Sequence, residues 1–218
     1  RTNQRLINIF LVFVLFLATT PFDQHPVHAQ SPEDGFTPVI DGEVWAIAEN
    51  AADGTIYIGG QFTTIDGVNQ AYLARLYSNG ELDTSFSPVV DERVKAIVIQ
   101  DDGKILISGW FSTVNGLDQD NLARLNHDGS LDETFNPIVD RGINALAIDS
   151  SGNIYLGGSF ENINGMPHEY LARLDSEGVL DADFHPDLND VPVSLFVQDD
   201  DKILVGGWFT QVEGEERV

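Results

Sequence analysis

The chain has 218 residues, of which 35 are acidic and 11 are lysine or arginine, so its formal net charge at pH 7 is −24. A protein this acidic repels phosphate backbones, which argues against a nucleic-acid partner. It contains no cysteine, so no disulfide can stabilise it and the fold must depend on packing.

The first 29 residues have the pattern of a secretory signal peptide. Arg1 and Arg5 precede an apolar run, Leu6 to Ala18, which is too short to cross a bilayer comfortably. The small-residue sequence at 27–29 then predicts cleavage before Gln30. The alternative is an uncleaved anchor, but no second apolar stretch of this kind follows. We therefore expect a bacterial protein that is secreted or held at the cell surface, with no membrane span in its mature chain.

A unit of 49 residues recurs along almost all of the remaining chain. Its landmarks are a GGxF-like element, the sequence LARL and an LDxxF element. They begin at Gly59, Ser108, Gly157 and Gly206, at Leu73, Leu122 and Leu171, and at Leu82, Leu131 and Leu180. A period of about 40–50 residues is typical of propellers and solenoids.

The repeat divides the chain after the signal peptide into a polar leading segment, residues 30–43, and a repeat region, residues 44–218. The blades expected in this region are 44–88, 93–137, 142–186 and an incomplete 193–218. Closed propellers usually need at least four blades. We therefore expect an all-β partial β-propeller of about three and a half four-stranded blades, belonging to a longer protein.

Each unit is predicted to form four short strands, a to d. In the second unit they are Val94 to Ile99, Ile105 to Phe111, Asn121 to Leu125 and Leu131 to Phe135. Strand b is almost continuously apolar, which is typical of a strand buried on both faces. Asp102-Gly103 and Asp128-Gly129 predict tight turns with glycine at positive φ. The longest connection, b to c, is predicted to be a loop.

The order of the strands determines which connections share a face. In an up-and-down meander the a–b and c–d turns lie on one face, and the b–c and d–a connections lie on the other, which we call the long-loop face. Its connections are longer and differ more between units, so we expect a ligand there. The paired glycines of GGxF should allow a neighbouring blade to approach closely, with the phenylalanine filling the space between blades.

The combination DGKILxxGxF…NG…LARLNxDGSLDxxFNP resembles the bacterial delta-60 repeat family, whose repeats form β-propellers. The resemblance covers roughly residues 44–209. It implies the propeller fold but carries no general chemistry. The GH and WD signatures of WD-repeat propellers are absent, as are the Tyr and Trp partners of kelch repeats.

An arginine of LARL stands eight residues before the aspartate of LDxxF in each complete unit. These pairs are Arg75 with Asp83, Arg124 with Asp132, and Arg173 with Asp181. If the c–d turn ends in a bulged glycine, the two side chains face each other across the hairpin. We interpret them as structural ion pairs, not as a site.

Asp41, Asp91 and Asp140 each lie three residues after a proline and just before strand a, with Asn189 at the fourth position. Strand a lines the channel of a propeller, so these carboxylates could converge around one mouth of the complete ring and share a calcium ion. The alternative is that each caps its own turn in water. Apart from this calcium hypothesis, we expect no cofactor.

No catalytic triad, zinc-ligand spacing or phosphate loop is present. His168, beside Glu169, is the one histidine with some prospect of a ligand role. Trp110 and Trp208 occupy the variable position of GGxF, where they either stack on a sugar ring or pack between blades. We expect a non-catalytic binding scaffold for an unknown protein or carbohydrate. The alternatives are the propeller of an exported enzyme whose catalytic residues lie elsewhere, and a structural spacer.

Overall fold

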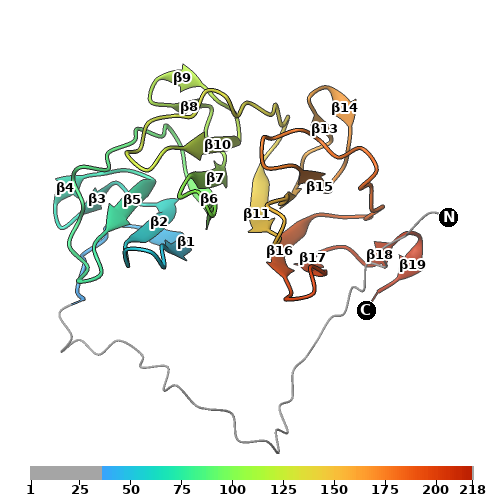
Figure 1. Ribbon diagram of the computed structural model, residues 1–218, viewed down its shortest axis with the longest axis horizontal. Coiled ribbons are helices and arrows are strands. Elements are labelled where there is room, and N and C mark those ends of the chain that lie inside the picture. Colours follow the sequence, from blue (N-terminus) through green and yellow to red (C-terminus); the bar gives the residue numbers. More distant parts are fainter. Residues whose placement is uncertain (1–35, 218) are drawn as a thin grey trace, which may run out of the picture.

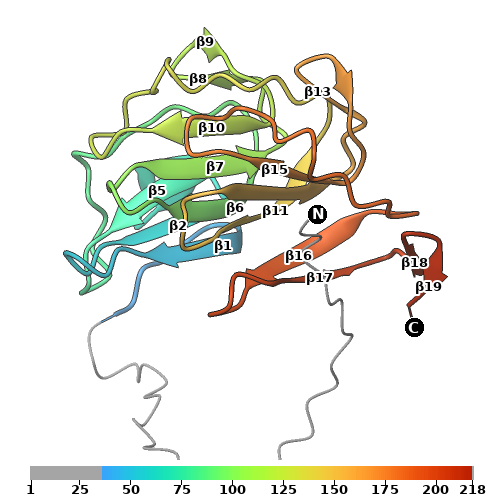
Figure 2. The ribbon, with the colours of Figure 1, turned by 45° about the vertical axis from the view of Figure 1, so that its right-hand side comes forward.

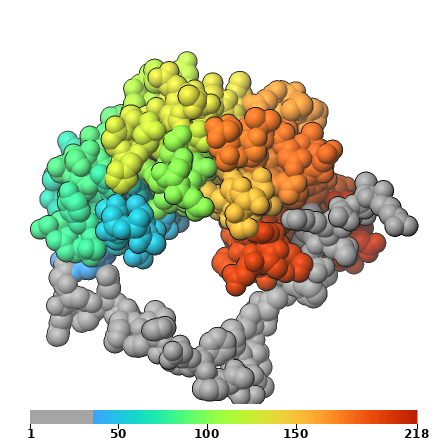
Figure 3. Space-filling model, viewed as in Figure 1, coloured from blue at the N-terminus to red at the C-terminus, as the bar shows by residue number. Residues whose placement is uncertain are grey.

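The computed structural model describes residues 36–217, which form an all-β structure of four consecutive repeats arranged in an arc (Figures 1 and 2). The predicted signal peptide lies outside the described residues. Within them, no helix is long and apolar enough to cross a membrane. The first strand of each repeat lies on the concave side of the arc, which is open between the first and fourth repeats (Figure 3).

Three kinds of strand build the main sheet of each unit. The inner strands are β1 (Glu43–Glu49), β6 (Val94–Ile99), β11 (Ile143–Ile148) and β16 (Pro192–Val197). The middle strands are β2 (Ile56–Gln61), β7 (Ile105–Gly109), β12 (Ile154–Gly158) and β17 (Ile203–Gly207). The third strands are β5 (Leu73–Leu76), β10 (Leu122–Leu125) and β15 (Leu171–Leu174). All pairs are antiparallel, and the middle strand is central wherever a third strand is present.

The continuous apolar run predicted for strand b corresponds to a middle strand that is buried on both faces. All five residues of β7 are buried, because the side chains of a strand alternate between the two neighbouring units. The hydrophobic clusters accordingly lie between units. One joins Tyr57 and Phe86 of the first unit to Ile97 and Phe111 of the second, and equivalent clusters follow at the next two junctions. The predicted role of the GGxF phenylalanine is confirmed: Phe111 is 1% exposed.

The two glycines at the end of each middle strand are needed for different reasons. A Cβ on Gly59 would lie 2.7 Å from Val94 Cγ1 of the next unit, so this glycine permits close packing of units. A Cβ on Gly60 would lie 2.0 Å from the backbone oxygen of Glu43 in its own inner strand. That second contact occurs where the inner strand is bulged, between Val44 and Ala46.

The b–c connection contains a small hairpin instead of the predicted loop. The four hairpins are β3 (Thr64–Ile65) with β4 (Val68–Asn69), β8 (Thr113–Val114) with β9 (Leu117–Asp118), β13 (Asn162–Ile163) with β14 (Met166–Pro167), and β18 (Gln211–Val212) with β19 (Glu215–Glu216). Both turn residues of β8–β9, Asn115 and Gly116, have positive φ, as a two-residue type I′ turn requires. Val90 of the d–a connection makes a bridge to Val114, so this hairpin is joined to the segment that enters its unit.

The predicted fourth strand is much shorter than expected. Leu131 makes a single bridge to Leu125, and residues 132–137 continue without a ladder. Asp132 explains the difference, because its carboxylate accepts hydrogen bonds from the backbone and side chain of Thr134 and turns the chain away from the sheet. Each complete unit is therefore a three-stranded sheet with one bridged segment, plus the added hairpin.

Candidate functional site

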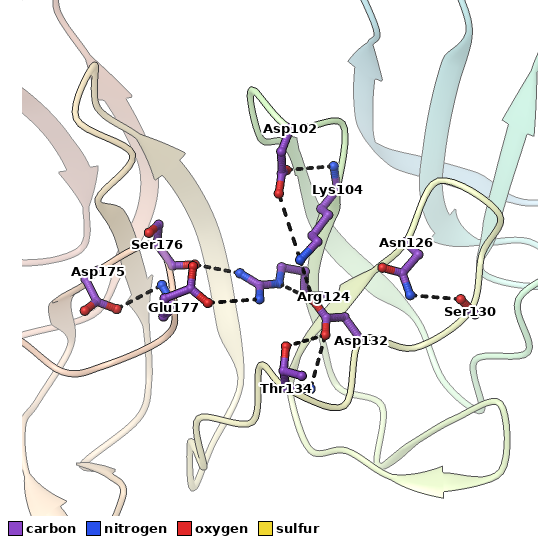
Figure 4. Close-up of polar contacts among 10 residues, drawn as sticks. All are labelled: Asp102, Lys104, Arg124, Asn126, Ser130, Asp132, Thr134, Asp175, Ser176 and Glu177. Carbon is purple, nitrogen blue, oxygen red and sulfur yellow. Dashed lines mark hydrogen bonds and ion pairs between the residues drawn. The ribbon is translucent and has the colours of Figure 1, made fainter.

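The arginine–aspartate pairs predicted from the eight-residue spacing are present in all three complete units. The closest distances are 2.7 Å from Arg75 to Asp83, 2.8 Å from Arg124 to Asp132 and 2.5 Å from Arg173 to Asp181. Each guanidinium also lies over the ring of the LDxxF phenylalanine, at 4.6 Å in the case of Arg124 and Phe135. These pairs belong to the framework, and Figure 4 shows the one in the second unit.

The environment of these aspartates keeps them ionised. Burial alone would raise the pKa of Asp83, but hydrogen bonds from Ser85 and Arg75 outweigh it and lower that pKa to about 2. The pKa of Asp132 is held well below its usual range for the same reasons, with Lys104 as an additional donor at 2.9 Å. Permanently charged and buried carboxylates of this kind do not serve as general acids near neutral pH.

Asp41, Asp91 and Asp140 each accept three hydrogen bonds from the start of the hairpin in their own unit. Asp91 accepts from the backbone of Ser112 and Thr113 at 2.9 and 3.0 Å, and from the Ser112 hydroxyl at 2.7 Å. Asn189 accepts the equivalent two backbone bonds in the fourth unit. In residues 36–217 no group of three or more acidic or histidine side chains is placed to hold a metal ion. The calcium hypothesis stays a prediction about the complete ring.

The tryptophans of the GGxF element are exposed and are not buried between units. Trp110 is 50% exposed and Trp208 is 71% exposed. Trp110 lies beside Gly142 at the entrance to β11, where a Cβ would come within 2.6 Å of the indole nitrogen. The glycine at this position therefore allows the indole to lie against the next unit while keeping part of its surface in solvent.

A cation–aromatic cluster surrounds Trp110 at the long-loop end of the inner strands. The Lys95 ammonium lies 4.0 Å from the ring centre of Trp45 and 5.0 Å from that of Trp110. The Arg93 guanidinium lies 5.7 and 5.1 Å from the same two ring centres. Glu92 pairs with Arg93 at 2.8 Å, and Glu43 accepts a hydrogen bond from the Trp45 indole at 2.9 Å. Two consecutive units thus contribute side chains to one small polar and aromatic surface.

Two backbone positions of this cluster recur in every unit, but the residues at them do not. One position is the bulged residue of the inner strand, which has no partner in the ladder, and the other is the residue after the paired glycines. We call these eight the mouth residues: Trp45, Lys95, Asn144 and Val193 at the bulge, and Gln61, Trp110, Ser159 and Trp208 after the glycines. None of the eight is buried. A bulge re-aims a side chain without disturbing the rest of the strand, so these positions can vary freely in a constant framework.

His168 lies apart from the mouth residues, in the third hairpin. It is 3% exposed, its Nε2 has no hydrogen-bond partner among the described residues, and its ring stacks on His185 with centroids 4.7 Å apart. Burial, together with repulsion from His185, lowers the pKa of His168. Glu169 and Asp187 line the shallow hollow beside this pair.

Sequence analysis identified Trp110 and Trp208 but missed Trp45, Arg93 and Lys95. The signal was present, because the residue at the bulge of the inner strand changes from Trp to Lys to Asn to Val, while the residue before it is apolar in every unit. It was overlooked because Trp45 and Lys95 look like ordinary members of an alternating strand until the bulge is known.

The repeats match a known family model. It describes a β-propeller domain of unknown function, DUF5122, and matches residues 51–86, 100–135, 150–184 and 198–218. The chain belongs to this family. A comparison with curated proteins finds no match. The DUF5122 match covers the part of each unit from the a–b turn to the LDxxF phenylalanine, so it includes the framework ion pairs but not the bulge position.

The chemistry available to these DUF5122 repeats follows from the mouth residues. Indole rings offer flat apolar surfaces for stacking, and Lys95 offers positive charge, whereas the charge of Arg93 is paired with Glu92. The pKa of Glu92, the carboxylate that pairs with Arg93, is lowered by its hydrogen bonds to that arginine. The arrangement is suited to holding a ligand.

Proposed function

We propose that this protein is a non-catalytic binding scaffold that holds its ligand on the long-loop face, at the mouth residues. The observation that carries the proposal is the contrast between units. Framework positions such as LARL are repeated without change in the three complete units, whereas the bulge position carries a different residue in each unit and the post-glycine position varies among Gln, Trp and Ser. A purely structural role gives no reason for three tryptophans and a lysine to stand at these positions.

We further propose that the protein acts outside the cell, as a bacterial repeat protein of the delta-60 type. The support is the signal-peptide pattern of residues 1–29 and the resemblance of the repeats. Sequencing the N-terminus of the secreted protein tests whether the signal peptide is cleaved before Gln30. A product that begins at Gln30 supports it, and one that retains residues 6–18 overturns it.

The binding proposal is tested with arrays of saccharides and peptides probed with the full-length protein and two double variants. Trp110→Ala with Lys95→Ala removes the centre of the cluster. Tyr77→Ala with Lys202→Ala changes an exposed aromatic and an exposed lysine on the opposite face. We expect probes bound by the wild type to be lost by the first variant and kept by the second.

The opposite pattern, or equal binding by both variants, would show that the ligand lies elsewhere. Recovery of the bound probe tests the non-catalytic part of the proposal. An unchanged probe supports a scaffold, and a cleaved or modified probe would show that the protein is an enzyme.

A further inference from the structure

The positive charge of the mouth residues stands out because almost every other cation in the described chain is neutralised. Three arginines are in the framework ion pairs, and Lys104, Arg141 and Lys202 each pair with a carboxylate. Lys95 makes no ion pair with any described residue and is held between two indole rings instead. Its charge is therefore available to an incoming anion.

Trp110, beside the Lys95 ammonium, determines what kind of apolar surface a ligand meets next to that positive charge. Trp110 exposes half of its side chain, and Gly142 leaves it the room to lie against the next unit. An indole face next to a free ammonium presents a flat apolar surface and a hydrogen-bond donor at one edge of it. This combination matches a pyranose ring that carries a carboxylate, because the ring stacks while the carboxylate pairs with Lys95.

The overall charge limits the length of such a ligand. With a net charge of −24, the protein repels a long polyanion over most of its surface. A single carboxylate, or a few on a short chain, meets the local positive charge of Lys95 without approaching the remaining acidic surface.

We infer that the mouth residues bind a short saccharide bearing a carboxylated sugar, with Trp110 stacking on one of its rings and Lys95 pairing with its carboxylate. This inference rests on the proposed binding function and specifies its ligand class. It makes the charge of Lys95 the source of preference for acidic over neutral sugars.

The experiment compares two probes that differ only at the carboxylate, trigalacturonic acid and the neutral galactose trimer of the same linkage. Calorimetry and tryptophan fluorescence on the full-length protein measure both affinities. We expect the acidic trimer to bind at least tenfold more tightly, and that preference to weaken as salt is raised. Lys95→Met should reduce the preference to less than threefold, whereas Lys202→Met, a lysine change on the opposite face, should leave it intact.

Further measurements distinguish the carboxylated saccharide from other classes of ligand. Trp110→Ala should abolish binding of both trimers, and long polygalacturonate should bind more weakly per residue than the trimer. Equal affinity for the two trimers, or tighter binding of an acidic peptide of the same charge, would overturn the inference. If array ligands depend on Trp110 and Lys95 but neither trimer binds, the saccharide class is wrong and the binding function stands. If neither array ligands nor trimers depend on these residues, both proposals fail.

Discussion

Arg124 in the second unit donates a hydrogen bond from Nη1 to the backbone carbonyl of Ser176 in the third unit, at 2.6 Å (Figure 4). Arg75 makes the equivalent bond to His127 of the second unit at 2.7 Å. The same guanidinium therefore pairs with the aspartate of its own unit and fixes the c–d turn of the next. Arginine can do both because its planar fork directs donors along different lines.

Replacing Arg124 should destabilise the repeat array strongly. Arg124→Ala removes a side chain that is 2% exposed and leaves buried Asp132 with Lys104 as its remaining cation. Breaking a buried pair in this way costs about 3–5 kcal/mol. Arg124→Lys keeps a charge but cannot make both bonds, so its loss should be intermediate. Urea unfolding measures both effects.

An exposed ion pair provides the control for Arg124. Arg141 and Glu161 pair at 2.7 Å with both side chains about half exposed, so Arg141→Ala should cost less than about 1 kcal/mol. A loss as large as that of Arg124→Ala would mean that burial and the inter-unit bond contribute little.

Substitutions at the first residue of the GGxF element should change stability in opposite directions in two units. Ser108 replaces the glycine in the second unit, where its hydroxyl is buried without a partner among the described residues. Ser108→Ala removes that unsatisfied group and should stabilise the protein by about 1 kcal/mol. Gly59→Ser places a Cβ 2.7 Å from Val94 Cγ1 and should destabilise it by about 1–3 kcal/mol. Thermal unfolding of both variants checks the signs, and a loss of stability in Ser108→Ala would contradict the assignment.

His168 should make the third unit sensitive to mild acid. Because the folded-state pKa of His168 is below its unfolded value near 6.5, the unfolded chain binds the proton more readily. Stability should therefore fall as pH drops from about 7 to 5. His185 opposes protonation, whereas Asp181 favours it and Glu169 and Asp187 lie beside the pair, so the loss should be partial.

The other units supply the matched variants for this pH dependence. Gln119 holds the equivalent position in the second unit and donates a hydrogen bond to the Leu122 carbonyl at 2.6 Å. His168→Gln should flatten the stability profile between pH 7 and 5, and Gln119→His should steepen it. Urea midpoints across this range are the measurement, and parallel profiles for wild type and His168→Gln would refute the role of this histidine.

Asp91 tests the choice between hairpin capping and cation binding. Asp91→Asn should cost little, because Asn189 accepts the same two backbone bonds, whereas Asp91→Ala should cost about 1 kcal/mol or more. Calcium titration of the full-length protein completes the test. Affinity that disappears in Asp91→Asn with Asp140→Asn would assign these carboxylates to a cation.

Much of the framework could be predicted from the sequence because it depends on local spacing. The positive φ of Gly103 and Gly129, the bounds of β6 and the pairing of Arg124 with Asp132 all follow from residues less than one unit apart, and the 49-residue step is read directly from the recurring landmarks. In each case a turn or an alternating strand determines the geometry without reference to the next unit.

The features that were missed depend on contacts between elements or on very short strands. Asn115-Gly116 is a strong hairpin signal, but strands of two residues are too short to show alternation, so the hairpin was predicted as a loop. The second hydrogen bond of Arg124 reaches a residue 52 positions away, which no local pattern encodes. The cluster around Lys95 depends on a bulge and on a residue from the preceding unit.

The hydrophobic clusters and the hydrogen bonds of Arg75 and Arg124 join each unit to the next in the same way. A gene that gains or loses a whole repeat therefore keeps the same contacts at every boundary between units. Recombination between two misaligned copies would add or remove one repeat and leave every remaining boundary with the partners it already has. The mouth residues would move with their repeat, so duplication and loss would rearrange the ligand-facing chemistry while folding is preserved. Such a protein can acquire a new specificity by shuffling copies before any point mutation arises.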